Sequence, residues 1–141
     1  MKFFVTLLFV SFTLFVQAQD SGFFIGKWIV IDVLLSKDAS ADDKKALEMM
    51  KPYLLKTRFQ FDKGNRGICN MTLPTIVQGI KPSSDVYWIY DPTNRNLIIK
   101  EWKLRKRVTA EYTVKIEDDD VYFVLTDGPL ILKVKKQKVY K

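Results

Sequence analysis

The spacing of apolar residues changes from one part of this chain to the next, and the changes predict a long strand, one helix and a series of shorter strands. Residues 23–35 are apolar on both faces of an extended chain. One face would carry Ile29, Ile31, Val33 and Leu35, and the other Trp28, Val30, Asp32 and Leu34. This pattern predicts a first strand that is covered from both sides for part of its length.

Residues 40–51 have the one clear helical pattern. Ser40 stands three residues before Asp43, which is the spacing of a capping box. Apolar positions then recur at helical spacing, at Ala46, Leu47, Met50 and Leu54. We expect Pro52 to end or kink this helix near Lys51, because proline lacks the amide hydrogen and its ring clashes with the preceding turn.

From Lys56 onward the period is two, and turn residues interrupt the pattern every eight to twelve positions. This arrangement is typical of an antiparallel meander. Residues 62–65, Asp-Lys-Gly-Asn, predict a tight hairpin turn. Residues 73–84, with two prolines and a glycine, predict a loop. The further strands are expected at residues 57–61, 67–71, 86–90, 97–102, 108–116, 121–126 and 130–135.

Eight antiparallel strands predict a mainly β fold, an up-and-down barrel with one short helix between the first two strands. The clearest alternation lies in residues 108–116, where Val108, Ala110, Tyr112, Val114 and Ile116 share one face. Closure into a barrel is favoured because it leaves no strand edge exposed. A sandwich of two sheets is the alternative.

Residues 1–18 resemble a removable export signal. A lysine at position 2 precedes an apolar run from Phe3 to Val16, and Val16-Gln17-Ala18 offers small residues for cleavage. We therefore expect residues 19–141 to be a single soluble domain, exported to the periplasm or the extracellular space, and to be monomeric. Without the leader the net charge is +6 rather than +7.

This positive charge suits an anionic partner such as a lipid headgroup or an acidic glycan, or it serves solubility alone. An anionic surface or an envelope protein is therefore kept as a possible partner. The densest basic cluster comprises Lys103, Arg105, Lys106 and Arg107. It is interpreted as a solvated turn, with contact to an anionic surface as the alternative. No nucleic acid partner is expected, given the export pattern.

The chain contains no histidine, so the commonest general base and metal ligand are both missing. Nucleophile motifs and phosphate-binding glycine loops are absent from the sequence as well. We therefore expect a protein that is not an enzyme and needs no cofactor or metal. The acidic residues 117–120 are interpreted as a hairpin tip, with a weak calcium site as the alternative. The single cysteine, Cys69, is interpreted as a small buried hydrophobe rather than a reactive thiol.

Three segments resemble the short exported lipocalin-like domains of bacteria. Gly26-Lys27-Trp28 resembles the Gly-x-Trp motif that opens lipocalins, while residues 57–64 and 125–134 look like the second strand and the final hairpin of those domains. Two lipocalin features are missing: the middle-loop motif, and the arginine that packs on the first-strand tryptophan. Lys135 or Lys136 could take the place of that arginine. The resemblance implies a barrel that binds small apolar molecules, or one that has become purely structural.

Aromatic residues are abundant on the faces expected to point inward. Such side chains either fill a small barrel or line a cavity for one small ligand. The candidate ligand-binding residues are Trp28, Val30, Phe59, Phe61, Trp88, Tyr90, Ile99, Tyr112, Phe123 and Leu132. Asp32 and Glu101 share faces with this set, and we expect them at the rim rather than as anchors inside a pocket.

The sequence therefore favours non-enzymatic binding of a small hydrophobic ligand. The alternative is a protein- or glycan-interaction module with a filled barrel and no ligand. If the barrel binds a ligand, Met49 and Met50 of the helix at residues 40–51 would face the ligand portal. If the barrel is filled, this helix would plug one barrel end. The presence of an internal cavity separates the two hypotheses.

Overall fold

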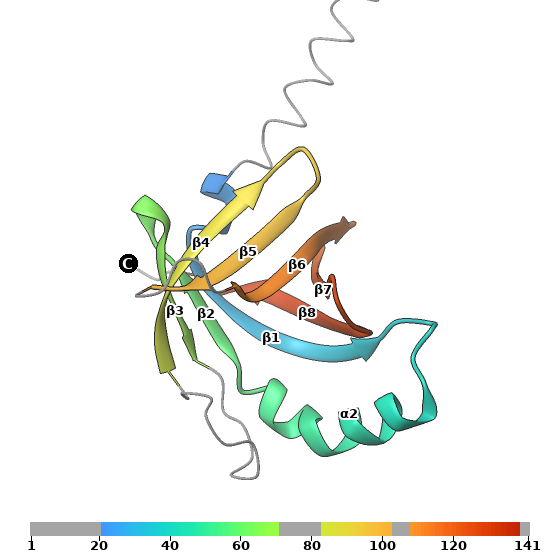
Figure 1. Ribbon diagram of the computed structural model, residues 1–141. Helices are drawn as coiled ribbons and strands as arrows, with labels where there is room; N and C mark the ends of the chain where they lie inside the picture. Colours follow the sequence, from blue (N-terminus) through green and yellow to red (C-terminus); the bar gives the residue numbers. More distant parts are fainter. Residues whose placement is uncertain (1–20, 71–82, 103–107, 139–141) are drawn as a thin grey trace, which may run out of the picture.

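Eight strands pair in chain order and close into an antiparallel barrel in the computed structural model, which describes residues 21–70, 83–102 and 108–138 (Figure 1). The strands are β1 (Gly26–Leu35), β2 (Arg58–Phe61), β3 (Arg66–Asn70), β4 (Ser83–Asp91), β5 (Asn96–Glu101), β6 (Val108–Glu117), β7 (Asp120–Leu125) and β8 (Leu130–Lys136). β1 pairs with both β2 and β8, so the sheet has no free edge strand. The predicted barrel is confirmed, and the sandwich is excluded.

A bulge in β1 interrupts the strict alternation of inward and outward side chains that the sequence predicted for this strand. The pairing with β8 shifts between Val30 and Asp32, so Ile31 is an extra residue opposite no partner. Trp28 and Val30 point inward as expected, but beyond the bulge it is Val33 that is buried, while Leu34 is exposed. An inserted residue reverses every later side chain, because the period of a strand is two.

The first predicted strand also begins too early. Residues Ser21–Phe24 form a 3₁₀ turn, η1, and the strand begins only at Gly26. The indole Nε1 of Trp28 donates a 2.8 Å hydrogen bond to Phe24 O, which fixes η1 over one end of the barrel. Phe24 is thereby placed inside, with about 1% of its surface exposed.

The helix α2 (Ala41–Leu54) begins as predicted and ends later than predicted. Ser40 Oγ accepts from the Asp43 amide at 3.1 Å, and Asp43 Oδ2 accepts from the Ser40 amide at 2.8 Å, which completes the capping box. Pro52 does not end the helix, which continues to Leu54. Pro52 lies in the last turn, where the Leu55 amide still donates to Lys51 O at 3.0 Å.

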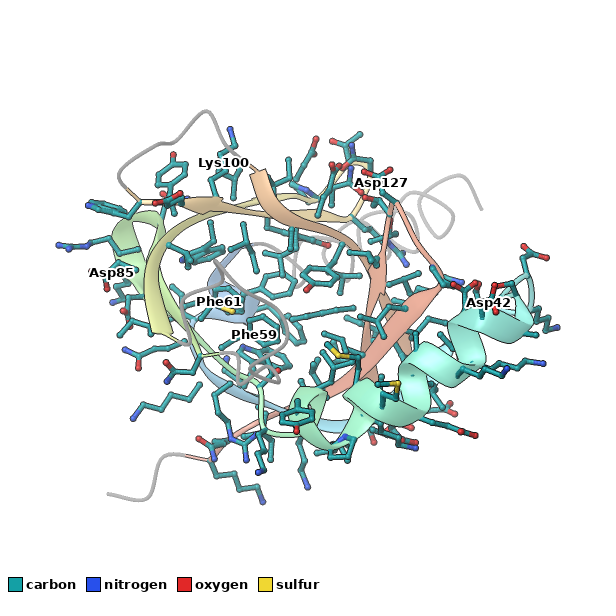
Figure 2. The ribbon with its side chains drawn as sticks, turned by 60° about the horizontal axis from the view of Figure 1, so that its bottom comes forward. Asp42, Phe59, Phe61, Asp85, Lys100 and Asp127 are labelled. Carbon is teal, nitrogen blue, oxygen red and sulfur yellow. The ribbon has the colours of Figure 1, made fainter. Side chains whose placement is uncertain are left out.

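α2 lies beside one end of the barrel. Figure 2, viewed toward that end, shows the helix to one side of the ring of strands and Phe59 and Phe61 within the ring. Leu54 is buried, Leu47 and Met50 pack against the core, and Met49 is exposed. The helix therefore does not plug the barrel, and only one of the two methionines faces the interior.

The β2–β3 hairpin was predicted from its turn residues and is confirmed. Its tip is a short 3₁₀ segment, η2 (Lys63–Asn65), in which Gly64 has φ +77° and Asn65 φ +64°. At Gly67 an added Cβ would overlap the backbone oxygen of Gln60 on the paired strand. A side chain is therefore excluded at this position.

The export signal at residues 1–18, most of the predicted loop at residues 73–84 and the basic cluster from Lys103 to Arg107 lie outside the described residues. Within the described part of the chain, no helix has the length and apolar character that crossing a membrane requires.

Candidate functional site

All ten candidate ligand-binding residues are buried in one core cluster, so the sequence placed them correctly on the inner faces. They are Trp28, Val30, Phe59, Phe61, Trp88, Tyr90, Ile99, Tyr112, Phe123 and Leu132. Their surroundings differ along the barrel axis, however. Those near η1 are packed ring against ring, and those nearer α2 border smaller side chains.

At the η1 end, Phe24 fills the barrel. Its ring centre lies 4.4 Å from that of Tyr90 and 6.2–6.4 Å from those of Trp28, Phe61 and Trp88. Aromatic pairs at such separations contribute packing energy beyond their buried area. Trp88 is also held by its Nε1, which donates to Arg66 O at 2.8 Å. The side chains at this end are therefore occupied in core packing.

The middle of the barrel holds a second aromatic group. The ring of Phe123 lies 5.7 Å from those of both Phe59 and Tyr112, and Phe59 lies 6.4 Å from Tyr112. This trio separates the filled η1 end from the end beside α2. We call this trio the floor of the barrel end beside α2.

Toward α2 the inward side chains become small or aliphatic. Cys69 is paired with Phe59 across β2 and β3, Ala110 with Ile99, and Leu125 with Tyr112. These three and Leu130 pack against the core but remain partly exposed. We call the group of Phe59, Cys69, Ala110, Tyr112, Phe123, Leu125 and Leu130 the helix-end site.

Three polar groups belong to this end of the barrel. Burial raises the pKa of the Cys69 thiol to about 11. Burial, with a smaller contribution from Cys69, raises the pKa of the Tyr112 hydroxyl above its usual range. Thr57, two residues before Phe59, has a fully buried hydroxyl with no hydrogen-bond partner among the described residues. The Cys69 thiol and the Tyr112 hydroxyl therefore stay protonated at neutral pH.

At the η1 end of the barrel, the side chain of Lys136 covers Gly26. Lys136 Nζ donates to Phe23 O at 2.8 Å and lies 5.7 Å from the Trp28 ring centre. Desolvation lowers the pKa of this lysine. A Cβ at Gly26, where φ is +135°, would stand 2.8 Å from Lys136 Cε. Of the two lysines expected to replace an arginine on the first-strand tryptophan, Lys135 and Lys136, it is Lys136 that lies over Trp28.

The acidic candidates lie away from the interior. Asp32 faces outward beyond the bulge and forms a 3.5 Å ion pair with Lys51 of α2. Glu101 is the last residue of β5, at the rim. Residues 117–120 form the β6–β7 hairpin tip, where Asp120 pairs with Lys133 at 3.5 Å. In the part of the chain that the structure covers, no three cysteine or acidic side chains gather as metal ligands do.

A groove lies on the outer face of β1, β2 and β3. This groove has a volume of about 290 Å³. Its lining comprises the core residues Trp28 and Phe59 and the outward residues Lys27, Arg58, Gln60, Ile68, Asn70 and Gln137. None of the outward residues was a candidate from the sequence, because they come from four separate segments. Only the register of the strands brings them together.

The sequence also missed Phe24, Thr57, Cys69 and Ala110 as residues near a site. Phe24 was assigned to a strand, and its position before the Gly-x-Trp motif was the one available signal. Cys69 and Ala110 alternate correctly with inward neighbours but are too small to attract notice as ligand contacts. Their significance depends on the space that small side chains leave between larger ones.

No protein-family model matches this chain, and no curated protein sequence matches it. Among solved structures, a DUF4847 family protein from Bacteroides vulgatus ATCC 8482 is similar, with a TM-score of 0.48 and 12% sequence identity. The match covers 82% of this chain and 96% of that protein. The lipocalin-like assignment stays a prediction.

Proposed function

We propose that this protein binds a small hydrophobic molecule at the helix-end site and carries out no chemical step on it. The observation that carries the proposal is the change of side chains along the barrel axis. Aromatic rings fill the η1 end, whereas partly exposed small and aliphatic side chains line the end beside α2. Apolar side chains that stay partly exposed around an inward-facing floor are suited to bind an apolar ligand.

The affinity would come mainly from removing apolar surface from water. Burial contributes about 25 cal/mol per Å², so a ligand that covers roughly 200 Å² of apolar surface gains about 5 kcal/mol. Phe59 and Phe123 would contact the inner end of the ligand, and Leu125 and Leu130 its sides. Met50 of α2 packs against the same core and adds a side chain that adjusts to irregular shapes.

Two hydroxyls would orient the ligand. Thr57 has a buried Oγ1 that finds no partner in the described part of the chain, and buried hydroxyls in proteins are almost always hydrogen-bonded. Tyr112 has a buried hydroxyl that burial holds in the protonated form. A ligand with an apolar body and one polar end group matches this pair, since a polar group that supplies hydrogen bonds offsets its own cost of desolvation.

A non-catalytic role is supported by the chemistry of the same residues. A cysteine acts as a nucleophile when its thiolate is stabilised. Burial has the opposite effect on Cys69, whose pKa of about 11 keeps the thiol protonated at neutral pH. The chain has no histidine to serve as a base for it. We place the binding activity outside the cytoplasm on the sequence pattern of residues 1–18 alone.

Binding of N-phenyl-1-naphthylamine, an uncharged probe whose fluorescence rises in apolar surroundings, tests the proposal. We expect saturable binding of one probe per chain. Ala110→Phe fills the helix-end site and should weaken the probe's affinity about tenfold or more. Ala46→Phe, on the exposed face of α2, is the matched control and should leave affinity unchanged.

Unsaturable probe binding, or equal loss in both variants, would overturn the proposal. Mass spectrometry of organic extracts from residues 19–141, purified from the native host, then identifies the class of ligand. A reproducible stoichiometric lipid supports the proposal. A clean extract, together with no response to the probe, contradicts it.

The second candidate function is an interaction module with a filled barrel. The observation in its favour is the continuous ring packing from Phe24 through Trp28 and Phe123 to Tyr112. Under this candidate Trp88→Ala and Ala110→Phe change stability alone. Recognition would then use the outer surface of the barrel.

A further inference from the structure

The outer groove across β1, β2 and β3 has the chemistry of a second binding site, independent of the interior. Figure 1 shows these three strands side by side. Lys27 is paired with Gln60, and Gln60 with Ile68, so three outward side chains form one row across the sheet. Gln137, the residue after β8, extends this row, because its backbone N–H donates to Lys27 O at 2.8 Å. Arg58 and Asn70 are paired beside it.

Arg58 is held in position by its own backbone neighbourhood. Its Nη1 donates to Leu55 O at 3.1 Å and to Thr57 O at 2.9 Å. Both bonds use Nη1, so the Nη2 and Nε donors take no part in them. A guanidinium that is already fixed loses less conformational entropy when it binds an anion, and it can bind a carboxylate with two parallel hydrogen bonds.

The groove is cationic. Lys27 and Arg58 are its charged lining residues, and none of the described residues that line it is acidic. Two acids stand at its margins. Asp62 accepts from Gln60 Nε2 at 3.2 Å, and Asp85 faces Ile68 across β3 and β4. On the other margin Lys135 is paired with Ile29, the neighbour of Arg58. An anionic group would therefore bind near β1 and the start of β2.

The remaining lining residues select among anions. Asn70 and Gln137 carry side-chain amides that both donate and accept hydrogen bonds, as sugar hydroxyls do, whereas a fully ionised phosphate group only accepts. Gln60 offers its carbonyl oxygen, because its Nε2 already donates to Asp62. Ile68 offers one apolar contact, which suits the C–H face of a sugar ring. The volume of about 290 Å³ lies at the lower end of the usual range for small-molecule sites, so it fits one or two rings.

We propose that the outer groove binds an acidic saccharide unit, with its carboxylate on Arg58 and Lys27 and its hydroxyls on the three amides. Phe59 lines this groove as well as the helix-end site, but the side chains that would contact the saccharide lie on the outer face of the strands. The two binding activities are therefore separable by variants on opposite faces of the same strands.

Isothermal titration calorimetry with a hyaluronan tetrasaccharide, which carries carboxylates, tests the proposal on the full chain, with maltotetraose as the neutral comparison. We expect binding of the acidic tetrasaccharide only, weakening as salt increases. Lys27→Gln and Arg58→Gln should each weaken it about tenfold, because one charged hydrogen bond is lost. Lys115→Gln, an exposed lysine on β6, is the matched control and should bind as the unmodified protein does.

Three outcomes overturn the proposal: no binding of the acidic tetrasaccharide, equal binding of maltotetraose, or an equal loss in Lys115→Gln, which would indicate attraction to net charge alone. Because Arg58 also caps backbone oxygens, Lys27→Gln decides the matter if Arg58→Gln unfolds. N-phenyl-1-naphthylamine binding by Lys27→Gln should be unchanged, so failure here is distinguishable from failure of the proposed function.

Discussion

The Nζ atom of Lys136 lies 5.7 Å from the ring centre of Trp28 and joins the last strand to the start of the first. The same atom donates to Phe23 O, and the lysine's stem covers Gly26. Gly26 is needed because a Cβ there would meet this stem and because its φ of +135° strains any other residue. The Gly-x-Trp motif thus has a physical role in closing the barrel.

Replacing Lys136 with methionine should lower the free energy of unfolding by about 1 kcal/mol. The variant retains the apolar stem but loses the cation over Trp28 and the hydrogen bond to Phe23. Lys138→Met, on an exposed residue two positions further on, should change stability by less than about 0.5 kcal/mol. Urea unfolding followed by tryptophan fluorescence measures both, and equal effects would mean that the Trp28 contact contributes nothing.

Phe24→Ala should be among the most destabilising changes, with a loss of roughly 3–5 kcal/mol. Phe24 is almost fully buried and fills the barrel end between Tyr90 and Trp28, so its removal leaves a cavity. Met49→Ala, at an exposed position on α2, serves as control. If guanidinium unfolding showed the two variants to be equally stable, η1 would not be part of the core.

Gly67→Ala should cost more stability than Gly64→Ala. At Gly67 the new Cβ would overlap Gln60 O, a backbone atom that moves only if β2 and β3 separate, and we expect a loss of about 2–3 kcal/mol. At Gly64 no atom of the described residues lies within 4 Å of an added Cβ, and the cost is the strain of φ +77°, about 1 kcal/mol. Thermal unfolding of both variants provides the comparison, and the reverse order would contradict the close approach of the two strands.

Cys69 should make the folded state lose stability in alkaline solution. Its pKa is about 11 in the folded protein against an ordinary 9.0, so above pH 9 the unfolded chain binds fewer protons than the folded one. Stability therefore falls as pH rises from about 9 to about 11. From pH 8 to pH 10 the loss due to this thiol is about 1 kcal/mol.

Cys69→Ala removes this contribution, so its stability should fall less between pH 8 and pH 10 than that of the unmodified protein. Urea unfolding at the two pH values measures the difference, and the cavity left by the substitution cancels because each protein is compared with itself. Identical slopes would show that the Cys69 thiol is not desolvated. The same burial predicts slow alkylation of Cys69 at neutral pH in the folded state.

Local sequence patterns were sufficient to predict the number and order of the strands, the β2–β3 hairpin turn and the helix start. The Ser40–Asp43 capping box, the turn at Gly64 and the alternation around Tyr112 all depend on residues a few positions apart, whose interactions a short segment specifies by itself. The same alternation correctly predicted that the ten candidate residues lie on the inner face, because the apolar side of each strand faces the barrel interior. It did not reveal how far along the axis each one lies.

The tertiary structure decided the features that depend on partners distant in the chain. The bulge after Val30 exists only in the pairing of β1 with β8, and it moved Val33 inward and Asp32 outward. Phe24 is a core residue because η1 lies over one end of the barrel and places the Phe24 side chain inside it. The helix-end site and the outer groove likewise arise from strand register. The sequence determines the local hydrophobic periodicity, because that depends on residues a few positions apart. The space between side chains depends on how strands distant in the chain pair, so only the tertiary structure defines it.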